Sequence, residues 1–217
     1  MSSEVITLFD PKADEKIISA FQKLICSYPP NTPSPLEART KSFKQWKQSH
    51  GGPCGIYRFT IHQQRGHPNQ EPNYAAQFFG CGAQHTAAAL GFRTSPVIHR
   101  LSEFISTVFA GIDPPAWAKY RETYVRAQDD YPLLRSLDPP LQCFVGYYLL
   151  VNVLTTIHRD VKDPPDGWVA MAVFGNYKNG ELYLPDMKLS LSYKPRTVVF
   201  LRSWALRHFI GHFEGDR

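Results

Sequence analysis

Hydrophobic residues recur with helical spacing in several stretches of the first 140 residues of the chain. The clearest stretch runs from residue 95 to residue 110, where Ser95 is a suitable N-cap residue and a proline follows it at the first helical position. Its apolar positions define one face of a helix: Ile98, Leu101, Phe104, Ile105, Val108 and Phe109. The same spacing predicts helices over residues 11–26, 35–48 and 114–126.

The hydrophobic period changes near residue 141. Residues 143–153 are apolar and mostly β-branched or aromatic, as expected of a buried core strand. Shorter strands are predicted at 168–174, 181–184, 188–192, 197–202 and 207–210, and earlier ones at 4–9, 56–62 and 75–79. Many short strands separated by turns are typical of a sandwich or barrel. We therefore predict an α+β, β-rich fold: a mostly helical elaboration with a few strands over residues 1–140, packed on the outer face of a β core over 141–217.

Length and composition set limits on the class of protein. The chain has 217 residues, of which 43% are hydrophobic and 20% charged, as in an ordinary soluble globular domain. No apolar run approaches the length of a membrane span or resembles a signal peptide. The four cysteines are scattered and form no CxxC pair: Cys26, Cys54, Cys81 and Cys143. An intracellular location, nuclear or cytoplasmic, with reduced thiols and no membrane partner is expected.

The formal net charge of +5 is compatible with an anionic partner such as nucleic acid. The predicted helix over residues 35–48 carries Lys41, Lys44 and Lys47, which could contact phosphates. A solvated helix face is the simpler explanation of the same charges. Nucleic-acid binding should weaken steeply as salt is added and as these lysines are neutralised, whereas a small-molecule enzyme should show neither effect.

Three residues suggest a metal site. His158 and Asp160 are two positions apart on a segment expected to be extended, so their side chains point to the same side. His208, on a predicted strand about fifty residues later, could supply a third ligand. His212 competes for that role, but Gly211 and Gly215 predict that the strand ends near residue 210, which favours His208. Two imidazoles and one carboxylate form the facial triad of non-haem Fe(II) oxygenases.

The segments around these ligands extend the pattern. They include Gly175-Asn176-Tyr177, Gly180-Glu181-Leu182, Leu201-Arg202-Ser203 and Leu206-Arg207-His208, and Arg217 follows His208 by nine residues. Over residues 144–217 the sequence resembles the 2-oxoglutarate and Fe(II)-dependent dioxygenases, most closely the fungal TET-like branch, which is related to the TET and J-binding-protein base oxygenases. The resemblance implies a double-stranded β-helix, or jelly roll, from about residue 141. It also implies Fe(II) bound by His158, Asp160 and His208, with O2 and 2-oxoglutarate as co-substrates and Arg217 paired with the far carboxylate of 2-oxoglutarate.

Other candidate residues follow from the same resemblance. Tyr148, Leu150 and Asn152 are expected to share one face of the strand over residues 143–153. The resemblance implies that Tyr148 and Asn152 offer a hydroxyl and an amide to 2-oxoglutarate, and the alternative is that both are ordinary polar groups of the core. Asp163 lies where TET-type relatives contact co-substrate or base, and capping of its own loop is equally compatible with its position.

The sequence departs from the family pattern in three places. Asn179 replaces the first glycine of Gly-Gly-Glu-Leu, and Arg196-Thr197 replaces a Gly-Asp turn; asparagine is acceptable there at positive φ. Relatives continue beyond the arginine with a serine and a final strand, which this sequence does not contain. An open sheet edge and the loss of one hydroxyl partner for 2-oxoglutarate are therefore expected.

The function implied by the resemblance is an oxidoreductase that hydroxylates a C–H bond. Its first candidate substrate is the methyl group of a modified base such as 5-methylcytosine in DNA or RNA, as in DNA demethylation. Two alternatives remain open. One is a hydroxylase of a protein side chain or a small molecule on the same barrel. The other is a non-catalytic, truncated remnant that binds metal or a partner without turnover.

Overall fold

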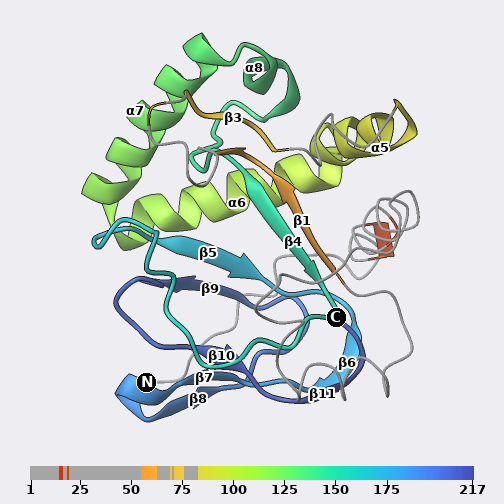
Figure 1. Cartoon of the computed structure of the whole chain (residues 1–217), viewed down its shortest axis with the longest axis vertical. Helices are drawn as coiled ribbons and strands as arrows, with labels where there is room; N and C mark the ends of the chain where they lie inside the picture. Colours follow the sequence, from red (N-terminus) through yellow and green to blue (C-terminus); the bar gives the residue numbers. More distant parts are fainter. Residues whose placement is uncertain (1–14, 17–18, 20–54, 63–68, 70, 76–82) are drawn as a thin grey trace. The chain divides into compact units, whose positions relative to one another are not determined.

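The computed structural model of the chain describes residues 15–16, 19, 55–62, 69, 71–75 and 83–217. The described residues belong to two compact units, one of residues 57–149 and one of residues 150–217 with 55–56 (Figure 1). From the sequence, the boundary between the mostly helical part and the β core was predicted between residues 140 and 141. The predicted strand over 4–9, the helix over 35–48 with Lys41, Lys44 and Lys47, and most of the helix over 11–26 lie outside the described residues.

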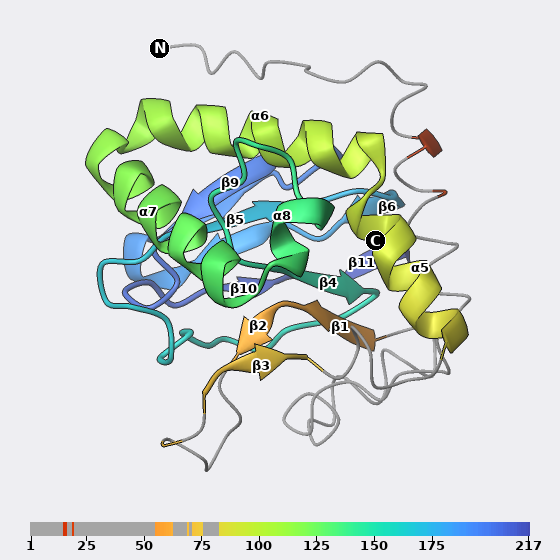
Figure 2. The ribbon, with the colours of Figure 1, turned by 90° about the horizontal axis from the view of Figure 1, so that it is seen from above.

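The unit of residues 57–149 contains the long helices (Figures 1 and 2). The long helices are α5 (Ala83–Arg93), α6 (Pro96–Ile112) and α7 (Pro114–Asp130), and the short helix α8 (Leu133–Leu137) follows them. The helices predicted over 95–110 and 114–126 are confirmed, and α6 buries Ile98, Leu101 and Phe109 of its predicted stripe. Ser95 occupies the predicted N-cap position of α6, and its side chain makes no capping hydrogen bond there. Asp113 caps α7 by accepting from the amide of Ala116 at 3.1 Å.

Strands in the same part of the chain are short. β1 (Gly55–Phe59) and β4 (Tyr147–Val151) form one two-stranded sheet, and β2 (Ile61–His62) pairs antiparallel with β3 (Asn73–Tyr74). The strand predicted over 56–62 is therefore interrupted at Thr60, and the one predicted over 143–153 is reduced to its middle.

A buried ion pair holds this unit together. The guanidinium of Arg93, fully buried, donates to both carboxylate oxygens of Asp138 and, at 2.9 Å, to the carbonyl of Phe59. The hydroxyl of Tyr124 donates to the same carboxylate at 2.6 Å. Because both charges are paired and hydrogen-bonded, their burial is compensated, and this network has a structural role.

The unit of residues 150–217 is built from strands. In chain order these are β5 (Val169–Ala172), β6 (Asn176–Asn179), β7 (Leu182–Leu184), β8 (Leu189–Leu191), β9 (Val198–Leu201), β10 (Phe209–Ile210) and β11 (Phe213–Asp216), with the 3-10 helix η1 (Pro185–Met187) after β7. β5 pairs with β9, β7 with both β8 and β10, and β6 with β11, all antiparallel. The fold is thus mixed helix and strand with small antiparallel sheets, and within the described residues none of the sheets closes on itself.

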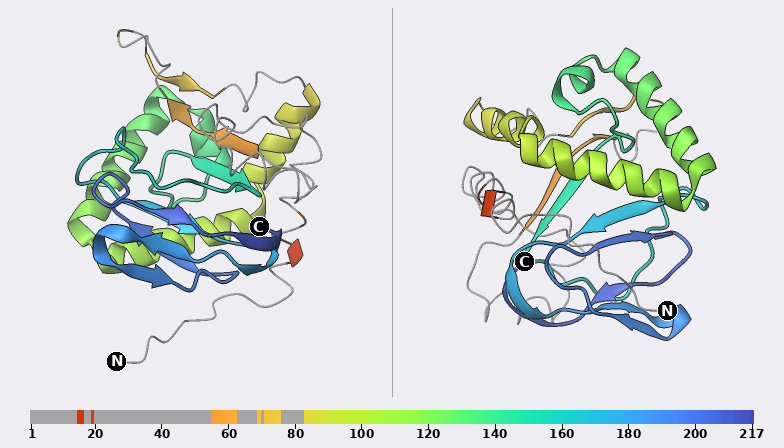
Figure 3. Two further views of the ribbon diagram at one scale, coloured as in Figure 1. Left: turned by 60° about the horizontal axis from the view of Figure 1, so that its bottom comes forward. Right: turned by 180° about the vertical axis from the view of Figure 1, so that it is seen from behind.

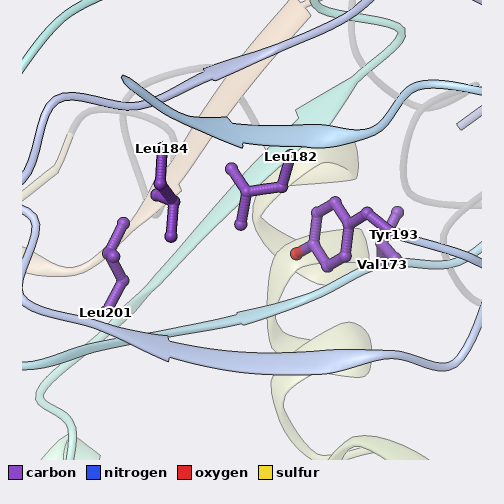
Figure 4. Packing of buried hydrophobic residues seen from close by; sticks show 5 residues of the cluster. All are labelled: Val173, Leu182, Leu184, Tyr193 and Leu201. Atoms are coloured by element: carbon purple, nitrogen blue, oxygen red, sulfur yellow. The ribbon is translucent and has the colours of Figure 1, made fainter. Parts of the chain in front are cut away.

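The core of this unit lies between two layers of strands, β5–β9 and β10–β7–β8 (Figure 3). Figure 4 shows the side chains that fill it: Val173, Leu182, Leu184, Tyr193 and Leu201. Leu182 is fully buried. This packing fixes the end of β9 and the start of β10, and the turn between these two strands carries residues 202–208.

Candidate metal centre

His158 and His208 face each other across an isolated antiparallel β-bridge. The amide of His158 donates to the carbonyl of His208 at 3.1 Å, and the amide of His208 donates to the carbonyl of His158 at 2.9 Å. Residues paired in this way project their side chains to the same face of the ladder. The two imidazole centroids are accordingly only 4.3 Å apart.

Asp160 completes the cluster. It is two residues beyond His158, and its amide donates to the carbonyl of Ser203 at 3.1 Å. One carboxylate oxygen of Asp160 lies 3.7 Å from Nε2 of His158, and the other lies 3.7 Å from Nε2 of His208. The three possible ligand atoms all lie within 4.8 Å of one another. The structure therefore brings together the three predicted ligands, whereas His212 is exposed between β10 and β11 and is not part of the cluster.

Backbone carbonyls determine the tautomer of both histidines. Nδ1 of His158 lies 2.7 Å from the carbonyl of Thr156, and Nδ1 of His208 lies 3.1 Å from the carbonyl of Leu206. A carbonyl only accepts, so a neutral ring in this position carries its proton on Nδ1 and has its lone pair on Nε2. Histidines that bind metals are held by the same kind of outer contact.

The donor set fits a divalent transition metal. At 3.7 Å the gaps between Nε2 and the carboxylate oxygens are too long for hydrogen bonds, so Asp160 does not simply pair with the rings. Ligands placed about 2.1 Å from an ion at right angles would be about 3.0 Å apart, so small side-chain rotations would complete the coordination. His208 is buried, whereas the side chain of Asp160 is 41% exposed, which leaves one side of the cluster open.

The loop after Asp160 is fastened by Ser203. This fully buried serine accepts from the amide of Asp160 through its carbonyl, and its hydroxyl donates to Asp163 at 2.5 Å. The amide of Asp163 donates in turn to the carbonyl of Asp160 at 2.9 Å. Of the two roles open to Asp163 from the sequence, the structure supports the one that holds the loop.

Replacing Ser203 with alanine should weaken the metal site without removing a ligand. The change leaves the Asp163 carboxylate without its hydroxyl partner, which should lower the free energy of unfolding by about 1–3 kcal/mol. We expect the affinity for Fe(II) or Co(II) to fall by about tenfold, as for other residues that orient ligands. Thermal unfolding and metal titration measure the two effects. Ser192→Ala, at an exposed position, is the matched control, and equal metal affinity in the two variants would contradict the role given to Ser203.

Burial lowers the pKa of His208 below its ordinary value of 6.5, and nearby His158 acts in the same direction. The unfolded chain therefore takes up a proton near pH 6.5 that the folded, metal-free chain resists. The free energy of unfolding should consequently fall as pH drops below about 6.5 and level off once the folded protein is also protonated. Chemical denaturation between pH 5 and 8 measures this dependence, which His208→Asn should reduce. An identical pH profile for wild type and variant would contradict it.

Arg217 follows β11, whose register with β6 pairs Phe213 with Asn179 and Asp216 with Asn176. Its guanidinium carbon lies 5.3 Å from the ring centroid of Tyr177, 4.9 Å from that of Tyr193 and 5.4 Å from that of Phe213. We call these three rings the aromatic cage.

The positive charge of Arg217 makes its guanidinium a candidate for binding an anion. Burial lowers the pKa of Arg217, and the hydroxyl of Tyr177, which is hydrogen-bonded to it, acts in the opposite direction. Within the described residues, the guanidinium makes no ion pair with an acidic side chain. Arg217 is thus a partly buried cation in aromatic surroundings, able to grip a carboxylate through two parallel hydrogen bonds.

Tyr148 and Asn152 do not lie on one face of a strand. Tyr148 and Leu150 are 61% and 44% exposed on β4, whereas Asn152 is 2% exposed. The strand ends at Val151, and Asn152 has a φ of 49°, which breaks the alternation on which the prediction depended. Tyr148 belongs to the unit of residues 57–149, where the guanidinium of Arg58 lies 5.7 Å from its ring centroid. Binding of 2-oxoglutarate by either residue stays a prediction.

The substituted turn positions have the backbone expected of them. Asn179 has a φ of 62° and Arg196 a φ of 74°, so both stand in the left-handed region that glycine favours. The amide of Arg196 donates to the carbonyl of Val173 at 2.7 Å, which ties this turn to the residue that follows β5.

Sequence reasoning identified none of the three residues of the aromatic cage, Phe213 and the tyrosines Tyr177 and Tyr193. The hydroxyl of Tyr177 donates to the backbone carbonyl of Tyr193, so the two rings are fixed relative to each other. A tyrosine in or beside a strand is typical of a half-buried sheet position, and nothing in the local pattern marks these two as neighbours of Arg217.

The remaining observations concern the chain as a whole. Cys143 is buried, and burial raises the pKa of its thiol, while the other three cysteines lie outside the described residues. None of the helices in the described part of the chain has both the length and the apolar character needed to cross a membrane. Comparison of the sequence with models of known protein families and with curated proteins found no match.

Proposed function

We propose that this protein is a 2-oxoglutarate and Fe(II)-dependent dioxygenase that hydroxylates a C–H bond, and that its substrate is the methyl group of a modified nucleic-acid base such as 5-methylcytosine. One observation carries the proposal: His158, Asp160 and His208 converge from two distant segments with both Nε2 atoms free to bind a metal. Two neutral imidazoles and a carboxylate are the donor set of non-haem Fe(II) oxygenases.

The same proposal includes the fold. We assign the antiparallel sheets of residues 150–217 to a distorted double-stranded β-helix, or jelly roll. Support comes from the two layers β5–β9 and β10–β7–β8, which pack around one hydrophobic core. In such a core, ligands carried on neighbouring strands can face one ion from one side.

The residues of the chain have distinct roles in this reaction. His158, Asp160 and His208 would hold Fe(II), and co-substrates would approach from the side on which the Asp160 carboxylate is exposed. Bound iron, together with 2-oxoglutarate and O2, supplies the oxidation: the keto acid becomes succinate and CO2, and the second oxygen atom is added to the C–H bond as a hydroxyl. Ser203 and the two backbone carbonyls at Nδ1 keep the ligands oriented.

Arg217 would bind the far carboxylate of 2-oxoglutarate. The three rings of the aromatic cage partly shield its guanidinium from water, so an ion pair formed there would be stronger than one at the surface. The hydroxyl of Tyr177 is hydrogen-bonded to the guanidinium and helps to hold it. A planar guanidinium that is held in this way favours a carboxylate over a neutral group.

The choice of a nucleic-acid base rests on the sequence resemblance and on the net charge of +5. Arg159 and Lys162, which flank Asp160, are exposed and could contact phosphates. A base within a duplex would have to be flipped out of the stack to reach the metal.

The experiment is to measure succinate formed from 2-oxoglutarate by the Fe(II)-loaded protein. Wild type should be compared with His158→Ala and Arg217→Ala, with and without methylated DNA. The proposal expects succinate formation that requires both residues, rises with methylated DNA and falls with added salt.

Other outcomes select among the alternatives. Turnover that depends on both residues but not on DNA would retain the oxygenase and favour a protein side chain or a small molecule as substrate. A folded, iron-binding protein that forms no succinate with any of these substrates would contradict catalysis and favour a remnant that binds without turnover.

A further inference from the structure

Asn152 makes three hydrogen bonds to Asp216, the last residue of β11, and to Arg217, which follows it. Its amide N–H donates to the carbonyl of Arg217 at 2.8 Å, and its side-chain oxygen accepts from the amide of Arg217 at 2.7 Å. Its side-chain nitrogen donates to the carboxylate of Asp216 at 3.0 Å. One residue thus binds both backbone polar groups of Arg217 and the side chain before it.

The backbone of Asn152 suits this task. The residue has a φ of 49°, a conformation that asparagine adopts more readily than most residues, and it is almost fully buried. Only an amide side chain both accepts and donates through neighbouring atoms, which is what the amide of Arg217 and the carboxylate of Asp216 require. An aspartate would place a second carboxylate next to Asp216.

Among the described residues, the backbone hydrogen bonds of Arg217 that the structure gives are the two to Asn152. The ladder between β6 and β11 ends at the pair of Asp216 with Asn176. A guanidinium that must stay among three rings and meet a carboxylate loses affinity if its backbone moves by even a fraction of an ångström.

We propose that Asn152 is a positioning residue: it clamps Arg217 and thereby holds the guanidinium in the aromatic cage, ready for the far carboxylate of the co-substrate. The co-substrate part rests on the proposed function; the clamp itself does not. The sequence resemblance implied direct contact of Asn152 with 2-oxoglutarate, which stays a prediction, and the role proposed here runs through Arg217.

Two kinds of variant test the clamp. Asn152→Gly removes the side chain while tolerating the positive φ. Asn152→Asp keeps an acceptor for the amide of Arg217 but places a second carboxylate against that of Asp216, so the two charges repel. Adding Asp216→Asn restores a hydrogen bond between the two side chains, with the donor now at position 216. The control is Asn179→Gly, since Asn179 has a similar φ of 62°, is exposed, and makes no side-chain hydrogen bond to another described residue.

Each protein should be examined in two ways. Hydrogen exchange of the Arg217 amide should accelerate by about tenfold in Asn152→Gly and stay unchanged in Asn179→Gly. Steady-state kinetics should show the KM for 2-oxoglutarate raised by about tenfold in Asn152→Gly and Asn152→Asp, with kcat and Fe(II) affinity close to wild type. The double variant Asn152→Asp with Asp216→Asn should recover most of the lost affinity.

The outcomes separate the clamp from the proposed function. Unchanged exchange of the Arg217 amide in Asn152→Gly would overturn the clamp. Faster exchange without any change in KM would show a merely structural contact and overturn the positioning role. A wild-type protein that neither binds nor consumes 2-oxoglutarate would refute the co-substrate part and the proposed function, while faster exchange in Asn152→Gly would still establish the clamp.

Discussion

Replacing His208 with alanine should abolish Fe(II) binding and lower succinate formation by about three orders of magnitude or more, because only two of the three ligands remain. The substitution should remove metal binding without unfolding the protein. Although His208 is buried, its bridge to His158 is made by backbone groups that the substitution leaves in place. Metal titration with Fe(II) or Co(II) and circular dichroism measure binding and fold separately.

His212→Ala is the matched control for this prediction. His212 is four residues further along the chain and exposed, and its backbone carbonyl, which the substitution keeps, accepts from the amide of Gly180 at 3.0 Å. This variant should bind metal as the wild type does. Loss of metal in His212→Ala, with binding retained in His208→Ala, would refute the assignment of the third ligand.

The local half of the site could be predicted from the sequence. His158 and Asp160 share one side of an extended segment because side chains alternate there, and that relation needs no tertiary information. The proximity of His208 to these two residues is not a local property of the sequence. It depends on a pair of backbone hydrogen bonds between segments fifty residues apart, and only the order of the motifs along the chain suggested it.

The strands were predicted where the hydrophobic pattern is strong and missed where it is weak. β5, β7, β8, β9 and β10 contribute side chains to or around the hydrophobic core, so their apolar residues identify them. β6 and β11 are mostly exposed and contain polar residues and glycine, as in Asn-Tyr-Lys-Asn and Phe-Glu-Gly-Asp. Their pairing with each other stabilises them, and a pairing partner cannot be read from local periodicity.

The error at Asn152 has a definite cause. Alternation was extended one residue past the end of β4, to a position where the backbone is left-handed. A positive φ redirects the side chain, so a residue expected beside Tyr148 instead reaches the end of β11. Asparagine is one of the few residues for which this turn of the backbone is to be expected, and that was the available signal.

The aromatic cage leads to the second large effect. Replacing Arg217 with lysine should raise the KM for 2-oxoglutarate by about a hundredfold, even though the formal charge is kept. An ammonium cannot form two parallel hydrogen bonds with a carboxylate, and burial among three rings penalises its charge. Metal affinity should not change, because Arg217 lies outside the cluster of ligands.

Arg202→Lys is the control for the lysine substitution. Arg202 is also an arginine beside an aromatic ring, with its guanidinium carbon 4.8 Å from the ring centroid of Trp168, but it is exposed and was given no catalytic role. Its replacement should leave the KM for 2-oxoglutarate within about twofold of wild type. Steady-state kinetics with 2-oxoglutarate as the varied substrate, beside metal titration of each variant, measure both expectations. If Arg217→Lys and Arg202→Lys behaved alike, the guanidinium of Arg217 would not be the group that binds the co-substrate, and the aromatic cage would be part of the hydrophobic core alone.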